Sequence, residues 1–97
     1  MNRVNNKVAL VTGGGSGIGR CIAHELAALG AMVIVTGRKQ EKLDAVAAEI
    51  IQDGGRAQTQ TFDIRDEDVV RANVAEILSR VGVINGLVNN AGGQFAA

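Results

Sequence analysis

The chain has 97 residues, of which 46% are hydrophobic and 21% charged, and its ten basic and ten acidic side chains give zero formal net charge at pH 7. Such a composition is typical of one globular domain, and zero net charge with two aromatic residues argues against a nucleic-acid partner. No apolar run approaches the roughly 20 residues of a membrane-spanning helix, so a membrane is not expected as a partner. A single cysteine cannot form an internal disulfide, which makes the cytoplasm the expected location.

Strands and helices alternate from the beginning of the chain. A strand is predicted over residues 7–11, where Val8, Ala9, Leu10 and Val11 form a continuous apolar run, as a parallel strand buried on both faces requires. A helix follows and ends near Gly30, and a second strand is predicted over residues 31–36. The apolar positions of that first helix are Ile18, Ile22, Leu26 and Leu29.

The same alternation continues to the end of the chain. A second helix is predicted over residues 41–52, a third strand over 57–62 and a fourth strand over 86–89. Asp66 is placed to cap a third helix between the last two strands. The apolar face of the second helix comprises Leu43, Val46, Ala47 and Ile50, and that of the third comprises Val70, Val74, Ile77, Leu78 and Val81.

This order of elements predicts an α/β fold, a Rossmann-type doubly wound parallel sheet with helices on both faces. The expected strand order is 3-2-1-4. Ligands of such sheets bind beyond the carboxyl ends of the strands, where the strand order reverses. Here that point lies between residues 11–13 and residues 89–91.

A glycine-rich loop follows the first strand directly. Gly13, Gly17 and Gly19 are spaced G-x-x-x-G-x-G after a threonine, and a helix begins within the run. Glycines let the backbone approach a phosphate, and the unpaired N–H groups of a helix N-terminus attract an anion. The loop therefore predicts a site for a dinucleotide pyrophosphate, and the alternative is a tight turn without a ligand. The candidate residues are Thr12, Gly13, Ser16, Gly17, Ile18 and Gly19.

The end of the second strand indicates which cofactor binds. A carboxylate at this position would bond the ribose 2′-hydroxyl of NAD, whereas an arginine accommodates the 2′-phosphate of NADP. The chain has Gly37 where the acid would be, followed by Arg38 and Lys39. NADP(H) is therefore predicted in preference to NAD(H), with Arg38 favoured by its position. The alternative is that both cations are solvated loop residues.

Three motifs together resemble the short-chain dehydrogenase/reductase family over the whole chain. They are the glycine loop, the run Asn89-Asn90-Ala91-Gly92 after the fourth strand, and Asp63 after the third strand. The resemblance implies that Asp63 and the adjacent Ile64 contact the adenine, and that Asn90, Ala91 and Gly92 complete the cofactor site. For Asp63, a cap of its own loop is the alternative.

Residues 90–95 are similar to those of the enoyl-CoA and dienoyl-CoA reductase branch, which suggests an acyl-CoA among small-molecule substrates. The family's catalytic serine and Tyr-x-x-x-Lys have no counterpart, because the chain contains no tyrosine. Residues 1–97 are therefore expected to be the N-terminal, cofactor-binding part of a homo-oligomeric oxidoreductase and to be inactive alone. The alternative is a non-enzymatic nucleotide-binding or interaction module of the same fold.

Two further residues are assigned structural roles. His24 lies on the first helix, away from the strand ends, and is expected at the surface or in packing. Cys21 has no basic neighbour or partner thiol in the sequence and is expected to be a small buried side chain. No metal-ligand cluster is apparent in the sequence.

Overall fold

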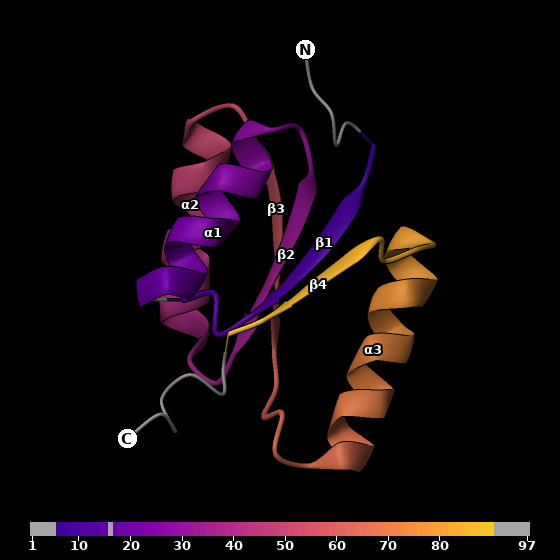
Figure 1. The fold of residues 1–97 in the computed structure, drawn as a ribbon. Helices are drawn as coiled ribbons and strands as arrows, with labels where there is room; N and C mark the ends of the chain where they lie inside the picture. The colour runs from indigo at the N-terminus through magenta and orange to yellow at the C-terminus, as the bar shows by residue number, and fades with distance from the viewer. Residues whose placement is uncertain (1–5, 16, 91–97) are drawn as a thin grey trace.

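The computed structural model describes residues 6–15 and 17–90, which form a four-stranded parallel sheet with three helices (Figure 1). The strand order is β3-β2-β1-β4, as predicted. The elements are β1 (Val8–Thr12), α1 (Gly17–Ala28), β2 (Met32–Gly37), α2 (Gln40–Gln52), β3 (Arg56–Thr61), α3 (Glu67–Val81) and β4 (Gly86–Asn89). The first three strands each begin and end within one residue of the predicted bounds, and the fourth matches them.

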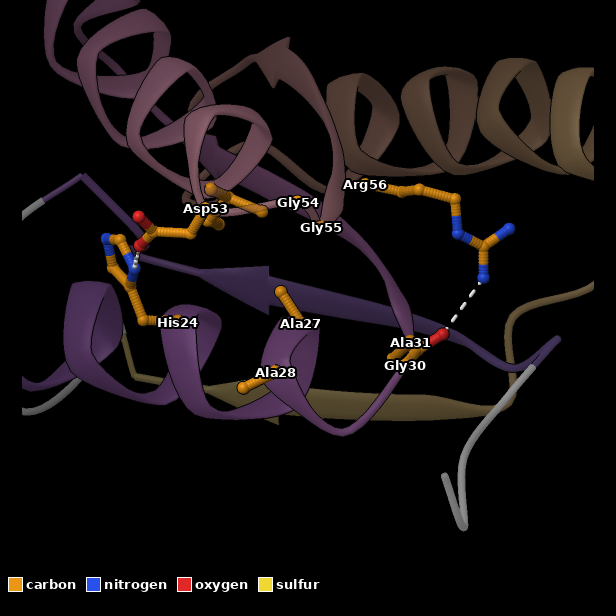
Figure 2. A pocket seen from close by; sticks show the side chains of 10 residues that line it. His24, Ala27, Ala28, Gly30, Ala31, Asp53, Gly54, Gly55 and Arg56 are labelled. Atoms are coloured by element: carbon orange, nitrogen blue, oxygen red, sulfur yellow. Dashed lines mark hydrogen bonds and ion pairs between the residues drawn. The ribbon is translucent and has the colours of Figure 1, made fainter. Parts of the chain in front are cut away.

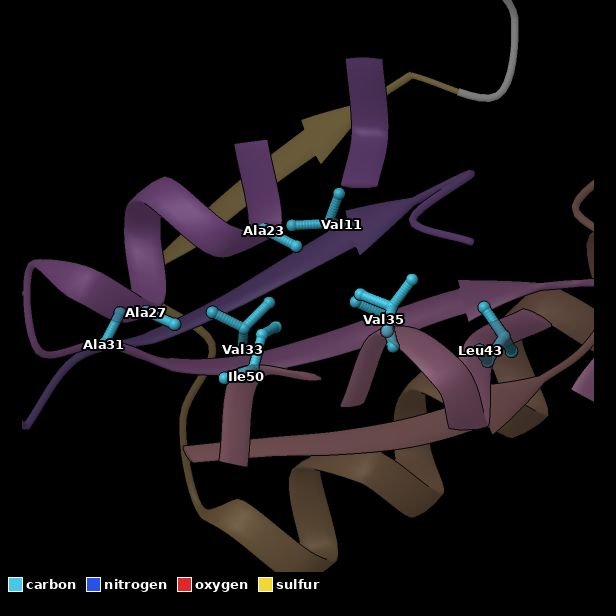
Figure 3. Packing of buried hydrophobic residues seen from close by; sticks show 9 residues of the cluster. Val11, Ala23, Ala27, Ala31, Val33, Val35, Leu43 and Ile50 are labelled. Atoms are coloured by element: carbon cyan, nitrogen blue, oxygen red, sulfur yellow. The ribbon is translucent and has the colours of Figure 1, made fainter. Parts of the chain in front are cut away.

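The helices cover both faces of the sheet, with α1 and α2 on one face and α3 on the other (Figure 1). Alternate strand residues face opposite sides, so Val33 and Val35 pack under α1 and α2 while Ile34 packs toward α3. Figure 3 shows the larger of the two cores, which Leu43 and Ile50 of α2 complete. Each such side chain, fully buried, contributes about 1.5–3 kcal/mol through the hydrophobic effect.

Helix α1 buries only part of the predicted face: Leu26 packs, half-buried, against the core, but the fully enclosed positions are others. Ala23 is fully buried and Ala27 is 7% exposed, whereas Ile18 is 69% exposed and Leu29 is 46% exposed. Small side chains let the helix axis approach the valines of the sheet closely, so the alanine stripe forms the contact. The expectation for Cys21 was also wrong, because its side chain is exposed.

Helix α3 begins where predicted. The Asp66 side chain accepts hydrogen bonds from the backbone N–H groups of Asp68 (3.0 Å) and Val69 (3.2 Å), which confirms the cap. Of the five apolar positions predicted for this helix only Ile77 is buried, and Leu78 is 40% exposed. Among residues 6–15 and 17–90, α3 alone covers this face of the sheet, and a smaller share of its apolar side is buried than of that of α2.

Strand β4 pairs with β1 and lies at an edge of the described sheet. Just before it, Asn85 forms two hydrogen bonds of 2.8 Å with the backbone of Val8, one through its side chain and one through its N–H group. The Leu87 side chain is 64% exposed. No helix among the described residues has the length and apolar character that a membrane crossing needs.

Candidate dinucleotide site

Hydrogen bonds tie the carboxyl ends of β1 and β4 together. The Thr12 hydroxyl accepts from the backbone N–H of Asn90 at 3.0 Å. Its own hydrogen is directed toward Asn89 Oδ1 at 3.0 Å and the Val88 carbonyl at 3.3 Å. Thr12 is only 7% exposed, so it joins the two strand ends from inside the fold. This junction is the point of strand-order reversal at which the sequence predicts a ligand.

The glycine loop is built so tightly that side chains would not fit at two positions. A Cβ on Gly19 would lie 2.1 Å from the Gly13 carbonyl oxygen and 2.9 Å from Asn90 Nδ2. A Cβ on Gly14 would lie 2.8 Å from Cγ1 of Val35 in the neighbouring strand. The absence of a side chain at Gly19 lets the start of α1 pack against the backbone of the loop. The absence of one at Gly14 lets the loop pass close to Val35 of β2. Gly14 is absent from the predicted site, although its place in a run of three glycines could have indicated it.

Gly17 has a different role, because it faces open space. Its φ is +60°, which favours glycine, and a Cβ there would meet no atom within 4 Å. Gly17 is also the first residue of α1, a helix of 12 residues whose first N–H groups have no partner in the helix itself. Open space beside the N-terminus of a helix is where the unpaired N–H groups of proteins bind an anion such as a phosphate.

The ends of β2 and β3 bring the next group of predicted residues to the same edge. Gly37 ends β2, and the exposed Arg38 and Lys39 follow it. Asp63 follows β3, and the positive charge of Arg38 contributes to lowering the pKa of its carboxyl group. The backbone N–H of Phe62 donates to the Gly37 carbonyl at 3.0 Å, so the segments that carry Arg38 and Asp63 leave neighbouring strands at the same end of the sheet.

The Asp63 carboxylate is bound mainly by Arg65, a residue absent from the predicted site. Arg65 Nη2 lies 2.7 Å from Asp63 Oδ2, and hydrogen bonds from Arg65 lower the pKa of Asp63 to about 2. The carboxylate is consequently ionised at every physiological pH. Ile64, between them, is 36% exposed. A cation two positions after the aspartate is the signal that could have pointed to this pair.

The structure places the described candidates along one edge of the sheet, at the carboxyl ends of its strands. They are Thr12, Gly13, Gly17, Ile18, Gly19, Arg38, Lys39, Asp63, Ile64 and Asn90. Ser16, Ala91 and Gly92 lie outside the described residues. Among the residues that are described, no group of histidine, cysteine and acidic side chains could hold a metal ion.

A cavity of about 310 Å³ lies at the opposite edge of the sheet, where β2 and β3 begin (Figure 2). His24 and Asp53 stand at one side of it and Arg56 at the other, with alanines and glycines between them. His24 Nε2 lies 2.8 Å from Glu49 Oε1, and Arg56 Nη2 donates to the Gly30 carbonyl at 2.9 Å. The structure confirms a packing role for His24, which links α1 to α2. This cavity is separate from the predicted cofactor site.

The strand order, the two helical layers and the glycine loop at the carboxyl edge define a Rossmann-type α/β domain. Residues 7–97 match the family model described as short chain dehydrogenase. The chain belongs to the short-chain dehydrogenase family.

Individual relatives agree with this assignment. A citronellol catabolism dehydrogenase from Pseudomonas aeruginosa superposes with a TM-score of 0.89 at 53% identity, covering 91% of this chain and 37% of that one. A metagenomic short-chain oxidoreductase in complex with NADP gives a TM-score of 0.89 at 42% identity, covering 91% and 40%. A 3beta-hydroxysteroid dehydrogenase from Mediterraneibacter gnavus is 41% identical over 95% of this chain and 33% of its own length. The chain spans about a third of the length of the curated relatives it matches.

Proposed function

We propose that the chain binds NADP(H) at the carboxyl edge of its sheet. The loop of residues 13–19 and the start of α1 would hold the pyrophosphate, Arg38 the 2′-phosphate, and Asp63 with Ile64 the adenine. Asn90 would face the nicotinamide-side ribose, and Ala91 and Gly92 are proposed to belong to the same site. The observation that carries this proposal is the cradle between Gly13, Gly17 and Gly19, where tight glycine packing leaves the helix start open.

Three observations favour NADP(H) over NAD(H). No acidic side chain occupies position 37, so nothing there would repel a phosphate or accept from a free 2′-hydroxyl. Arg38 is exposed beside the site, and no hydrogen bond or ion pair to its side chain is present among the described residues. Its planar guanidinium suits bidentate contact with phosphate. A similar solved structure, the metagenomic oxidoreductase, is itself a complex with NADP.

The whole protein is proposed to be an oxidoreductase that transfers a hydride between NADP(H) and a carbonyl or enoyl thioester of a small molecule. The catalytic acid would come from outside residues 1–97, because this segment contains no tyrosine. We further propose that the complete enzyme is a cytoplasmic homo-oligomer. A nucleotide-binding module without catalysis is the second candidate, and oxidation of NADPH by the full-length protein with carbonyl or enoyl-thioester substrates separates the two.

Nuclear magnetic resonance tests the binding site directly. NADPH is titrated into the isotopically labelled protein, and the backbone amide signals of residues 13–19 are followed together with those around the opposite cavity. We expect saturable shifts in the glycine loop and unchanged signals at Gly54 and Gly55. Saturable binding that leaves the loop signals unmoved would place the cofactor elsewhere.

A further inference from the structure

We infer that Arg65 is a positioning residue that aims the Asp63 carboxylate, so that the adenosine end of the site selects a purine with an amino group at C6 over one with a carbonyl. The inference rests on the proposed NADP(H) site and extends it to a residue outside the candidate set. The purine selectivity would then depend on a side chain that need not touch the cofactor.

The side chains of Arg65 and Asp63 form a bidentate ion pair, called the fork below. Arg65 Nε lies 3.1 Å from both carboxylate oxygens of Asp63, and Nη2 lies 2.7 Å from Oδ2. The backbone N–H of Arg65 donates to Oδ1 at 2.9 Å, which fixes the same carboxylate from a second direction. Two planar groups joined by several bonds hold one relative orientation, whereas a single ion pair would let the carboxylate rotate.

The fork leaves limited room for another donor. A carboxylate has about four lone-pair positions, and three N–H groups of Arg65 are directed at this one. The Asp63 side chain nevertheless remains 37% exposed, so a ligand can still reach it. A carboxylate held in this way accepts about one further hydrogen bond, in a direction set by Arg65.

The ionisation of Asp63 decides which ligand group it accepts. An aspartate is ionised at neutral pH, and hydrogen bonds from Arg65 with, more weakly, the charge of Arg38 lower the pKa of Asp63 further, so the carboxylate is an acceptor only. The 6-amino group of adenine donates a hydrogen bond, whereas the 6-oxo group of hypoxanthine presents a lone pair. Hypoxanthine also has an N1–H donor, which on this inference lies outside the direction that Arg65 sets for the carboxylate. Removing Arg65 would free the carboxylate to rotate.

The experiment compares NADPH with its 6-oxo analogue, in which hypoxanthine replaces adenine, by calorimetric titration of the full-length protein. The variants are Arg65→Ala, Arg65→Lys and Asp63→Asn, and Arg71→Ala is the matched control. Arg71 is also an exposed arginine paired with a nearby acid, Glu67, but it lies on α3. Circular dichroism melting verifies that each variant is folded.

For the unaltered protein and for Arg71→Ala we expect NADPH to bind at least about tenfold more tightly than its 6-oxo analogue. This factor is the lower end of the range for a hydrogen bond to a charged group. Arg65→Ala should reduce that ratio to about two- to threefold, mainly by improving binding of the 6-oxo analogue. Arg65→Lys keeps the charge without the bidentate contact and should give an affinity ratio between those of the unaltered protein and Arg65→Ala. Asp63→Asn should bring the ratio near one, because an amide both donates and accepts.

Two results would overturn the inference, and they have different meanings. If both cofactors bind and the ratio is unchanged in Arg65→Ala, Arg65 does not orient Asp63 for purine recognition, while the NADP(H) proposal stands. If neither cofactor binds the unaltered protein, the proposed function fails and the inference fails with it.

Discussion

Thr12 and Asn90 are 78 positions apart in the sequence, yet the backbone N–H of Asn90 donates to the Thr12 hydroxyl at 3.0 Å. One small side chain therefore closes the junction of β1 and β4 at the edge where the cofactor is proposed to bind. The same hydroxyl approaches Asn89 Oδ1, so it satisfies polar groups on two consecutive residues of the returning chain.

Replacing Thr12 by valine keeps the shape of the side chain and removes the hydroxyl. We expect the free energy of unfolding to fall by about 1–3 kcal/mol, because the partners at Asn89 and Asn90 are left unsatisfied in a partly buried place. Urea denaturation followed by circular dichroism measures the change. Thr12→Ser, which restores the hydroxyl, should recover most of the loss, and equal losses in both variants would assign the effect to packing instead.

Replacing Arg38 by alanine should weaken NADPH binding by about 1.5–3 kcal/mol, or roughly ten- to 150-fold, and leave NADH binding nearly unchanged. Only NADPH has the 2′-phosphate that the guanidinium would contact. Fluorescence titration with both cofactors measures the two dissociation constants. Arg56→Ala is the control, because this exposed arginine lies at the opposite edge of the sheet. Equal losses for NADPH and NADH would contradict the role of Arg38.

The variants Gly19→Ala and Gly17→Ala should lose stability and cofactor binding to different extents. A Cβ on Gly19 would lie 2.1 Å from a backbone oxygen, so Gly19→Ala should lower the melting temperature and abolish cofactor binding together. Gly17→Ala meets no atom and should cost only about 1–2 kcal/mol for a left-handed backbone, while its methyl group obstructs the phosphate.

Melting curves combined with cofactor titrations separate these two effects. Gly86→Ala is the control, since a Cβ at that position also meets nothing within 4 Å and Gly86 lies in β4, away from the loop. Unimpaired NADPH binding by Gly17→Ala would argue against a pyrophosphate at the start of α1.

Glu49 links α2 to α1 and should make stability depend on pH. Its Oε1 lies 2.9 Å from Arg20 Nη2 and 2.8 Å from His24 Nε2, and hydrogen bonds from these partners lower the pKa of Glu49. A carboxyl group whose pKa is lower in the folded state stabilises the fold above its unfolded pKa of about 4.3. That contribution disappears as the pH falls through the folded value.

Glu49→Gln should therefore melt at a lower temperature than the unaltered protein at pH 7, and the difference should shrink below about pH 4. Differential scanning calorimetry between pH 3 and pH 7 tests this. Glu25→Gln is the control, because Glu25 is an exposed acid on α1 with no ion pair among the described residues. A difference between Glu49→Gln and the unaltered protein that stays constant down to pH 3 would contradict an electrostatic origin.

Much of this fold follows from local patterns in the sequence. The apolar run in β1, the periodic positions of α2 and the capping aspartate before α3 each depend on residues within one element. Every predicted strand and helix exists in the structure for that reason, and their alternation led to the observed strand order through the handedness of parallel crossovers. The spacing of Gly13, Gly17 and Gly19 likewise identified the loop, because glycine positions reflect backbone conformation.

Contacts between distant elements were decided by the tertiary structure. Ala23 and Ala27 are the buried side chains of α1 with Leu26 packed beside them, whereas Ile18 and Leu29 are exposed, because the side of the helix that meets the sheet depends on packing between elements. The surroundings of Cys21, which is exposed, likewise depend on which side of α1 meets the sheet. The bond between Thr12 and Asn90 depends on register between strands that are far apart in the chain. Sequence patterns specify the elements through short-range periodicity, and only packing determines which of their side chains meet.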